Sequence, residues 1–112
     1  MKFSSELLKG STKNLILSVL SGKKMYGYEI IKAIKDESDD LITLGEGSVY
    51  PALHELESRG LLTSNWVAQN NLPDRKYYTL TKKGGREFKA AAAEWKLFAG
   101  AVNKIYRLGA NH

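Results

Sequence analysis

The chain has 112 residues, a net charge of +5, 43% hydrophobic residues and no cysteine. This length suffices for one compact domain with an additional helix, and the composition is that of a folded protein rather than a disordered one. The missing cysteine excludes disulfides, thiolate metal sites and a cysteine nucleophile. We expect no metal and no cofactor. The apolar runs are too short to span a bilayer and the amino terminus lacks the pattern of a signal peptide, which predicts a cytoplasmic protein.

Positive charge is concentrated in the second half of the chain. Residues 1–40 hold seven lysines and six acidic residues, whereas residues 61–112 hold nine lysines or arginines and three acidic residues. A basic surplus favours a polyanionic partner, of which nucleic acid is the commonest. Charge alone leaves that partner open, since a run of charges is often only a solvated surface.

Two amphipathic helices are predicted in the first forty residues. The first begins near Ser11 or Thr12, either of which can cap it, and Gly22 suits a left-handed stop. Residues 6–9 form a preceding turn or extend this helix. The second helix spans residues 28–38 with three isoleucines on one face. Acidic residues follow it, and because they oppose the dipole at a carboxyl end we expect it to end there.

The third predicted helix carries the most specific signals. The segment Gly45-Glu46-Gly47 is expected to break the preceding structure, Ser48 to cap the helix and Pro51 to lie in its first turn. Gly60 closes the helix, and a stripe of valine and leucine faces inward. The opposite face is short and mostly polar. It consists of Tyr50, Pro51, His54, Glu55 and Ser58.

Two strands are predicted after the third helix, over residues 61–69 and 75–80. They are rich in tryptophan, tyrosine, threonine and valine, and the segment between them, Asn70-Asn71-Leu72-Pro73-Asp74, has the composition of a turn. Three helices followed by a two-stranded hairpin is the order of a winged helix-turn-helix domain, whose second and third helices dock on DNA. We therefore predict a mostly α-helical fold with a small β-hairpin, the wing.

A long helix is predicted from Thr81 almost to the end of the chain, although Gly84 and Gly85 in its first turn disfavour an early start. Its apolar residues alternate four and three positions apart, which is the seam of a coiled coil. A helix this apolar needs a cover, and a second copy of the chain is the simplest one. We therefore predict a homodimer, with a DNA-binding domain over residues 1–80 and a dimerisation helix over residues 81–112.

The predicted seam is defined by its spacing. It consists of Phe88, Ala92, Trp95, Ala99, Val102, Tyr106 and Gly109, and it is widened by Phe98, Ile105 and Leu108.

Three segments of the chain carry a family resemblance. Residues 16–30 contain Tyr-Gly-Tyr-Glu-Ile, residues 47–61 contain Gly-Ser-Val-Tyr-Pro-Ala-Leu, and residues 75–84 read Arg-Lys-Tyr-Tyr-Thr-Leu-Thr-Lys-Lys-Gly. In this order and spacing the chain resembles the PadR family of bacterial transcriptional regulators, in the branch with a single carboxy-terminal dimerisation helix. The resemblance implies a winged-helix dimer that binds palindromic operator DNA as a repressor. It also implies relief of repression when a small, often aromatic, molecule binds the dimer.

The third helix supplies the first group of candidate DNA contacts. Ser48 and Tyr50 are expected at its beginning, where hydroxyl and backbone N–H groups meet phosphates, and His54 and Ser58 are placed to reach base edges. Glu55 is able to accept from a cytosine amino group, but such a carboxylate more often only faces solvent. The candidates on this helix are Ser48, Tyr50, Pro51, His54 and Ser58.

The wing and the loop before the second helix supply the second group. Polar and basic residues there suit phosphate or minor-groove contact, although an exposed hairpin tip often carries such residues only for solubility. The candidates are Asn70, Asn71, Arg75 and Lys76 in the wing, and Lys23 and Lys24 in the loop.

Trp95 has two interpretations, which are compatible. As a seam residue it anchors the dimer interface. Alternatively, Trp95 and its symmetry mate, with Phe98 nearby, line a flat cavity for a small aromatic effector at the dimer centre. Small neighbours leave room for such a cavity, namely Ala91, Ala92 and Ala99.

The sequence also bears on three other function classes. An enzyme is not expected, because the chain offers only His54 and His112 as candidate bases, and Gly45-Glu46-Gly47 lacks the lysine of a phosphate loop. A metal-sensing repressor is disfavoured by the missing cysteine and the two histidines. A winged helix used for protein–protein contact without sequence-specific DNA binding is the remaining alternative, which the acidic residues 36–40 keep open.

Overall fold

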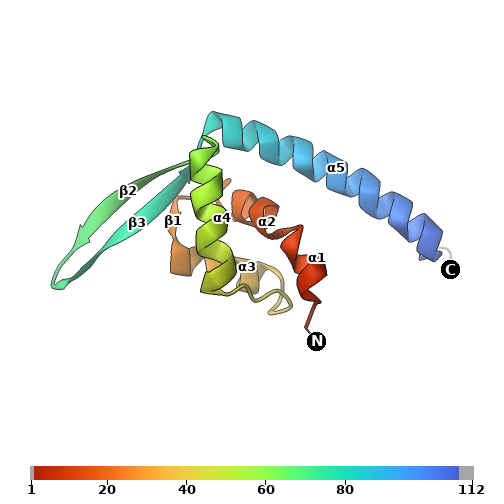
Figure 1. Cartoon of the computed structure of the whole chain (residues 1–112), viewed down its shortest axis with the longest axis horizontal. Coiled ribbons are helices and arrows are strands. Elements are labelled where there is room, and N and C mark those ends of the chain that lie inside the picture. Colours follow the sequence, from red (N-terminus) through yellow and green to blue (C-terminus); the bar gives the residue numbers. More distant parts are fainter. Residues whose placement is uncertain (1, 109–112) are drawn as a thin grey trace.

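The computed structural model describes residues 2–108, so Gly109 of the predicted seam and His112 lie outside the described residues. Within that range the chain forms five α-helices and three β-strands (Figure 1). In chain order they are α1 (Ser5–Lys9), α2 (Thr12–Val19), β1 (Met25–Tyr26), α3 (Gly27–Glu37), α4 (Glu46–Ser58), β2 (Leu62–Gln69), β3 (Leu72–Leu80) and α5 (Lys82–Tyr106). Strands β2 and β3 extend to one side of the helices as a wing, and α5 extends to the other side. This arrangement confirms the predicted winged helix with a long carboxy-terminal helix.

The hydrophobic core lies between α2, α3, α4 and the base of the sheet. Ile16, Leu17, Ile30, Leu53 and Leu62 come from four different elements, and each is at most 1% exposed. Burial of one such side chain contributes roughly 1.5–3 kcal/mol, so each helix presents its apolar stripe inward. The rotation of α4, and with it the outer face of that helix, is set by this packing.

The first two helices settle how residues 6–9 fold and correct the predicted end of the helix after them. Residues 5–9 form a separate helix, α1, in which the Leu7 amide donates to the Ser4 hydroxyl over 3.3 Å. Ser11 is the cap residue of α2, in line with the predicted start. The expected left-handed stop at Gly22 is wrong. Helix α2 ends at Val19 with right-handed geometry at Leu20, because the chain must turn there toward β1.

Helix α3 ends where the acidic residues predicted. Its last helical residue is Glu37, and Asp39 and Asp40 follow with φ angles of 53° and 66°. Aspartate tolerates this left-handed region better than most residues because its short side chain bonds locally. The Asp40 amide donates to the Lys35 carbonyl over 2.8 Å and so closes the last turn.

Helix α4 begins three residues earlier than predicted. Gly45 is the cap residue, and the amides of Ser48 and Val49 both donate to its carbonyl, at 3.1 and 3.0 Å. Pro51 therefore lies inside the helix and leaves the Gly47 carbonyl without its helical donor. Glycine and proline are weak helix formers, but the buried stripe of this helix outweighs their cost. The helix ends at Ser58, and Gly60 follows with a φ of 76°, as expected for the glycine predicted to close this helix.

The wing is longer, and its turn tighter, than predicted. Strand β3 begins at Leu72, so the turn consists of Asn70 and Asn71, the latter with a φ of 59°. An irregular pairing between Val67 and Gln69 accommodates the two-residue turn. Asn71 suits the positive φ that such hairpins require.

A strand that the sequence did not reveal completes the sheet. The two residues of β1 pair with β3, and the order is β1-β3-β2 in the described part of the chain. Met25 lies opposite Tyr78 and Tyr26 opposite Tyr77, so the loop before α3 is attached directly to the wing. A two-residue strand is too short to show alternation of apolar and polar residues.

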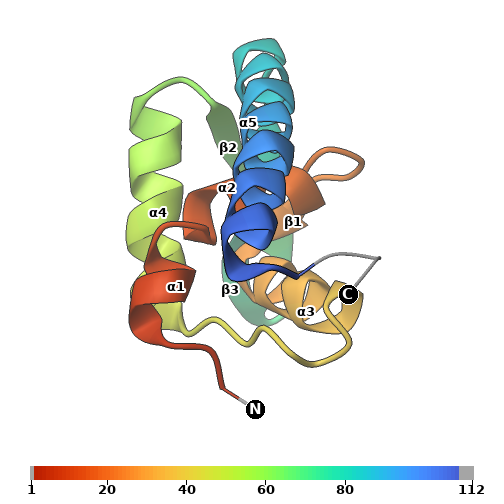
Figure 2. The ribbon, with the colours of Figure 1, turned by 90° about the vertical axis from the view of Figure 1, so that its right-hand side faces the viewer.

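Helix α5 is attached to the end of α4. Thr81 caps it by accepting from the Gly84 amide over 2.9 Å, and the Thr81 hydroxyl donates to the Gly60 carbonyl over 2.8 Å. Arg59 adds an ion pair with Glu87 at 2.5 Å. Figure 2, seen from the far end of α5, shows this helix passing over α2, which it contacts. The later turns extend past the rest of the chain.

Candidate DNA-binding surface

The outer face of α4 is exposed over its whole length. Val49, Leu53 and Leu56 point into the core and are at most 1% exposed. The residues on the opposite face are the predicted ones, and all of them are exposed: Tyr50, Pro51, His54, Glu55 and Ser58. Ser48 in the first turn is exposed as well. The predicted inward and outward faces of this helix are therefore confirmed, although the helix begins earlier.

Glu55 is engaged within its own chain. Its carboxylate forms an ion pair with Lys13 of α2, and both side chains are half-exposed. The hydrogen bond from Lys13 holds the pKa of the Glu55 carboxyl below its ordinary value. Glu55 thus joins α4 to α2, which makes it a poorer candidate for a cytosine amino group than His54 beside it.

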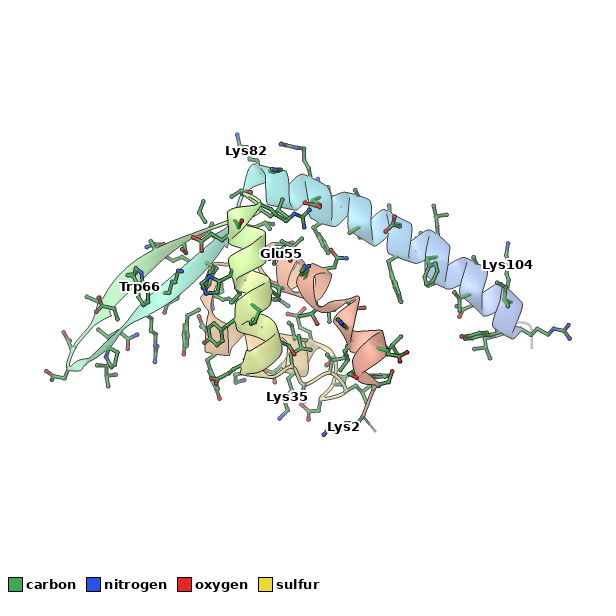
Figure 3. The ribbon with its side chains drawn as sticks, viewed as in Figure 1. Lys2, Lys35, Glu55, Trp66, Lys82 and Lys104 are labelled. Atoms are coloured by element: carbon green, nitrogen blue, oxygen red, sulfur yellow. The ribbon has the colours of Figure 1, made fainter. Side chains whose placement is uncertain are left out.

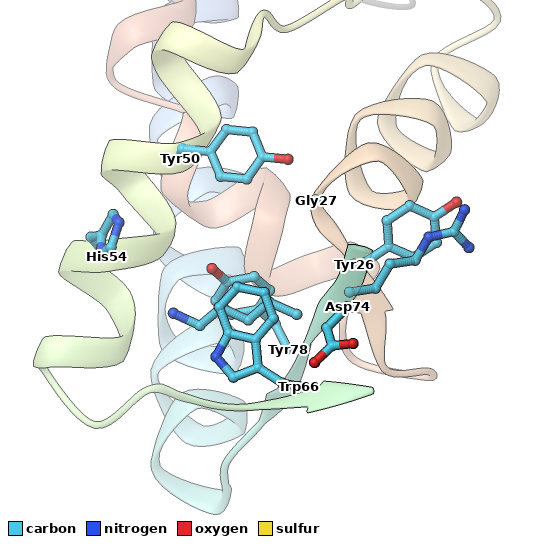
Figure 4. A pocket seen from close by; sticks show the side chains of 9 residues that line it. Tyr26, Gly27, Tyr50, His54, Trp66, Asp74 and Tyr78 are labelled. Carbon is cyan, nitrogen blue, oxygen red and sulfur yellow. The ribbon is translucent and has the colours of Figure 1, made fainter. Parts of the chain in front are cut away.

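Tyr50 points toward α3 rather than straight outward. Its ring lies against Gly27, the first residue of α3, and a Cβ placed on Gly27 would stand 2.7 Å from the Tyr50 Cζ atom. Figure 4 shows the Tyr50 ring crossing the space between α4 and α3. The expectation that Tyr50 lies at the beginning of the helix is wrong, because α4 starts at Glu46.

Lys76 is held between the wing and α4. Its ammonium lies 3.5 Å from a Glu57 carboxylate oxygen, and the other oxygen of Glu57 accepts from the Ser64 hydroxyl. The Lys76 ammonium also lies 5.8 Å from the ring centre of Trp66 and 5.5 Å from that of Tyr78. The sequence predicted a wing lysine for contact with DNA, and the structure places it in a network that joins α4 to both strands of the wing.

Arg75 points to the other face of the wing, as expected for consecutive strand residues. Its guanidinium lies 4.2 Å from the ring centre of Tyr26, and the rings of Tyr26 and Tyr77 meet edge to face at 5.4 Å. Lys24 lies 5.8 Å from the Tyr77 ring centre, and Lys23 beside it is exposed. Two of the predicted basic candidates are therefore brought together on one aromatic cluster at the base of the wing.

The wing tip stands apart from these clusters. Asn70 and Asn71 are both exposed and form the turn between β2 and β3. Figure 1 shows this turn at the far end of the hairpin. Their amides are available to a partner that approaches the wing from its end.

An open channel separates α4 from the wing. Its volume is about 420 Å³, and Tyr50 and His54 of α4 line one side of it (Figure 4). The other lining residues come from the wing, β1 and the start of α3, namely Trp66, Asp74, Arg75, Lys76, Tyr78, Tyr26 and Gly27. We call it the helix–wing channel. Trp66 was not among the predicted site residues, yet 64% of it is exposed in the middle of the wing (Figure 3). Strand alternation could have found it, because it places Trp66 on the face of Ser64 and opposite Lys76.

The family match includes α4 and the wing, which form most of this surface. Residues 16–90, from the core of α2 to the first turns of α5, match the transcriptional regulator PadR-like family. The chain belongs to the PadR-like family. Proteins of this family are transcriptional regulators, so this PadR-like chain is a DNA-binding regulator and not an enzyme, as the sequence predicted.

Individual relatives support the assignment. The negative transcriptional regulator PadR of Bacillus subtilis is 31% identical over 75 residues, which are 67% of this chain and 41% of that protein. The structure of a transcriptional regulator from Clostridium thermocellum superposes with a TM-score of 0.83 at 33% identity, covering 91% of this chain and 96% of that one. A PadR-like transcription factor from Bacteroides fragilis gives 0.75 at 36%, covering 90% and 95%. This PadR-like chain thus matches the solved regulators over nearly their whole length.

The predicted seam residues from Phe88 to Tyr106 lie on α5, whereas Leu108 lies beyond its end, after Arg107 with a φ of 60°. Trp95, Phe98, Ile105 and Tyr106 are all exposed, and the rings of Trp95 and Phe98 lie 6.2 Å apart. The smaller residues beside them are half-buried at Ala91, Ala99 and Val102, and exposed at Ala92.

Phe88 of the predicted seam is partly buried against the chain's own core. The first turns of α5, in which it lies, contact α2.

No helix among residues 2–108 is both long and apolar enough to cross a membrane.

Proposed function

We propose that this PadR-like protein is a cytoplasmic homodimeric repressor that binds a palindromic operator through α4 and the wing. Residues 1–80 form the DNA-binding domain and residues 81–112 the dimerisation segment. The observation that carries the proposal is the exposed outer face of α4 beside an exposed basic wing, in a chain of a transcription-regulator family. An exposed helix of this kind suits the major groove, and the wing suits the neighbouring minor groove.

Base readout is assigned to His54 and Ser58. Both side chains are exposed and lie on the middle and last turns of α4, whereas Tyr50 is turned toward α3. Ser48 and Pro51, nearer the beginning of α4, face the DNA backbone. Backbone contacts position the protein, and contacts to base edges select the sequence.

Phosphate contacts are assigned to the wing and to the loop before β1. Asn70, Asn71, Arg75, Lys23 and Lys24 are all exposed, so they meet a duplex without rearrangement of the fold. Lys76 joins them only by leaving Glu57. Each lysine or arginine that contacts a phosphate releases counterions, so the affinity should fall steeply with salt.

The dimer is assigned to the exposed apolar stripe of α5. Trp95, Phe98, Ile105 and Tyr106 are each at least 59% exposed, which is costly for a monomer in water. A second α5 packed against this stripe covers both copies at once, since a twofold interface is self-complementary. Ala99 and Val102 lie between these large side chains and Ala92 lies just before Trp95, and all three let the helices approach.

The regulator is a repressor, and a small aromatic effector relieves the repression. The B. subtilis relative is a negative regulator by name, which supports repression here. The tilted pair of Trp95 and Phe98 presents aromatic surface next to Ala91, Ala92 and Ala99. In the dimer these residues and their mates would line a flat cavity for a small aromatic effector.

The decisive experiment is a selection of binding sites from random duplexes by the wild-type protein, followed by titration of the selected duplex at several salt concentrations. We expect an imperfect palindrome whose half-sites are centred about one helical turn, or a multiple of it, apart. Replacing Arg75 and Lys23 together by alanine should weaken all duplexes alike and lower the salt slope by about two. A protein that enriches no sequence and binds no duplex would instead be a protein–protein interaction module.

A further inference from the structure

The helix–wing channel holds an exposed tryptophan that no step of the proposed function uses. Trp66 stands on the wing with 64% of its surface exposed, facing His54 and Tyr50 of α4. An indole carries a large apolar surface, and leaving it in water is unfavourable unless a partner covers it. The channel has room for such a partner, since it encloses about 420 Å³ and is open to solvent.

If the protein binds DNA as proposed, the position of the channel indicates which molecule covers Trp66. If α4 enters a major groove and the wing reaches the neighbouring minor groove, one sugar–phosphate strand separates the two grooves of the duplex. That strand has to cross the protein between α4 and the wing, and the space between these elements is the helix–wing channel. The channel therefore meets a DNA backbone, with its alternating deoxyribose rings and phosphates.

Two lining residues match the two parts of that backbone, and the other charged residues of the lining, Asp74 and Arg75, have formal charges that cancel. The flat face of Trp66 offers apolar surface to a deoxyribose, and Lys76, opposite Trp66 in the β2–β3 pair, offers a positive charge to a phosphate. The ammonium of Lys76 already lies 5.8 Å from the Trp66 ring centre, so both groups reach adjacent parts of one strand.

The present partner of Lys76 is weakly held. Its ammonium lies 3.5 Å from a Glu57 oxygen, longer than a strong charge-assisted hydrogen bond, and the other Glu57 oxygen already accepts from Ser64. A phosphate that enters the channel can replace Glu57 as the partner of Lys76, while Ser64 continues to hold Glu57. The wing then stays joined to α4 in the bound state.

We propose that one strand of the operator runs through the helix–wing channel, with a deoxyribose packed on Trp66 and the next phosphate bound by Lys76. This inference rests on the proposed DNA binding and adds to it a contact that is independent of base sequence. Trp66 is therefore a DNA-contacting residue that sets affinity, and His54 on the opposite wall is free to read bases.

Fluorine NMR of the wild-type chain labelled with 5-fluorotryptophan tests the contact directly. The chain has two tryptophans, Trp66 and Trp95, and Trp66→Phe assigns their two resonances. Adding the selected duplex should shift the Trp66 resonance and reduce its sensitivity to exchange of water for D₂O. The Trp95 resonance on α5 is the internal control and should remain in place.

Affinity measurements then separate the two contacts. Trp66→Ala should bind selected and random duplexes about tenfold more weakly, as expected for the loss of roughly 60 Å² of apolar contact, with an unchanged salt slope. Trp66→Phe should retain most of the affinity. Lys76→Met keeps the aliphatic stem and should lower the salt slope by about one.

The outcomes distinguish this inference from the function on which it rests. If the wild-type protein binds no duplex, the proposed function fails and the channel has no strand to hold. If the protein binds DNA but the Trp66 resonance and its solvent sensitivity stay unchanged, or Trp66→Ala binds like wild type, the channel is empty in the complex and this inference is overturned.

Discussion

The ring of Tyr50 on α4 occupies the space into which any side chain on Gly27 of α3 would have to grow. A Cβ on Gly27 would stand 2.7 Å from Cζ and 2.8 Å from a ring carbon of Tyr50. Gly27 is buried at the first turn of α3, so the glycine lets the two helices of the DNA-docking pair approach each other through this tyrosine. The position of the Tyr50 ring thus depends on a residue 23 positions away.

Gly27→Ala should therefore displace Tyr50 and lower DNA affinity. We expect a loss of about fivefold, or roughly 1 kcal/mol, with little change in the preferred sequence. The test is a double-mutant cycle with Tyr50→Ala, in which the effect of Gly27→Ala should disappear because its steric partner is gone. Gly22→Ala, a position with no neighbour within 4 Å, is the matched control. Equal effects of Gly27→Ala in both backgrounds would show that the contact does not transmit to DNA.

The junction of α5 is sensitive to one glycine and tolerant of the next. A Cβ on Gly84 would collide with the backbone carbonyl of Leu61 and stand 2.8 Å from a Leu80 methyl, whereas a Cβ on Gly85 would lie 3.8 Å from Leu80. Gly84→Ala should destabilise the fold by about 2–3 kcal/mol, because a backbone atom cannot move aside. Gly85→Ala should stabilise it by up to about 1 kcal/mol, the helix preference of alanine over glycine. Urea unfolding of both variants measures the difference, and equal stabilities would contradict this account.

The dimer should depend on the stripe of α5 and not on its opposite side. Val102→Asp places a charge in the middle of the proposed interface, at a cost on the order of 3 kcal/mol per buried charge, and should give monomers. Ala93→Asp puts the same charge on the exposed opposite side of the helix and should leave the dimer intact. Sedimentation velocity distinguishes the two. A wild-type protein that sediments as a monomer at micromolar concentration would refute the proposed interface.

His54 should determine one base in each half-site. His54→Ala is expected to change the preferred base at one position per half-site, at about 1–3 kcal/mol. Tyr50→Ala should weaken all sequences without changing the preference, since its ring is turned toward α3. Site selection with both variants beside wild type provides the measurement. An unaltered motif and affinity for His54→Ala would leave His54 as an exposed residue with no part in recognition.

Alkaline pH should act on the fold through Tyr78. Burial raises the pKa of the Tyr78 phenol above its ordinary value near 10, because the phenolate is poorly solvated in the core. The unfolded chain therefore loses this proton first, so the stabilisation by Tyr78 is complete below about pH 10 and is lost as the pH rises beyond it. Tyr78→Phe has no such proton. Its stability relative to wild type should improve between pH 8 and pH 11, and a constant difference in unfolding free energy would contradict the assignment.

Much of the architecture follows from local patterns. The stripes that place Ile30 in α3 and Leu53 in α4 inward recur every three or four residues, and burial of such a stripe is the main stabilisation of a short helix. The wing strands were recognisable from their β-branched and aromatic residues, and the exposed face of α4 followed from its inward one. Family membership was likewise visible in the order of three short segments.

The structure decided the features that depend on residues far apart in the sequence. No local periodicity in the sequence predicts these contacts. They are the pairing of Tyr26 with Tyr77, the packing of the Tyr50 ring on Gly27 and the ion pair of Lys76 with Glu57. The early start of α4 has the same origin. Local preference places Gly47 outside a helix and Pro51 in a first turn, but the packing of the whole helix on the core stabilises the earlier turn by more than these residues cost. The sequence alone therefore determined which faces are buried, while tertiary contacts decided where the site residues point.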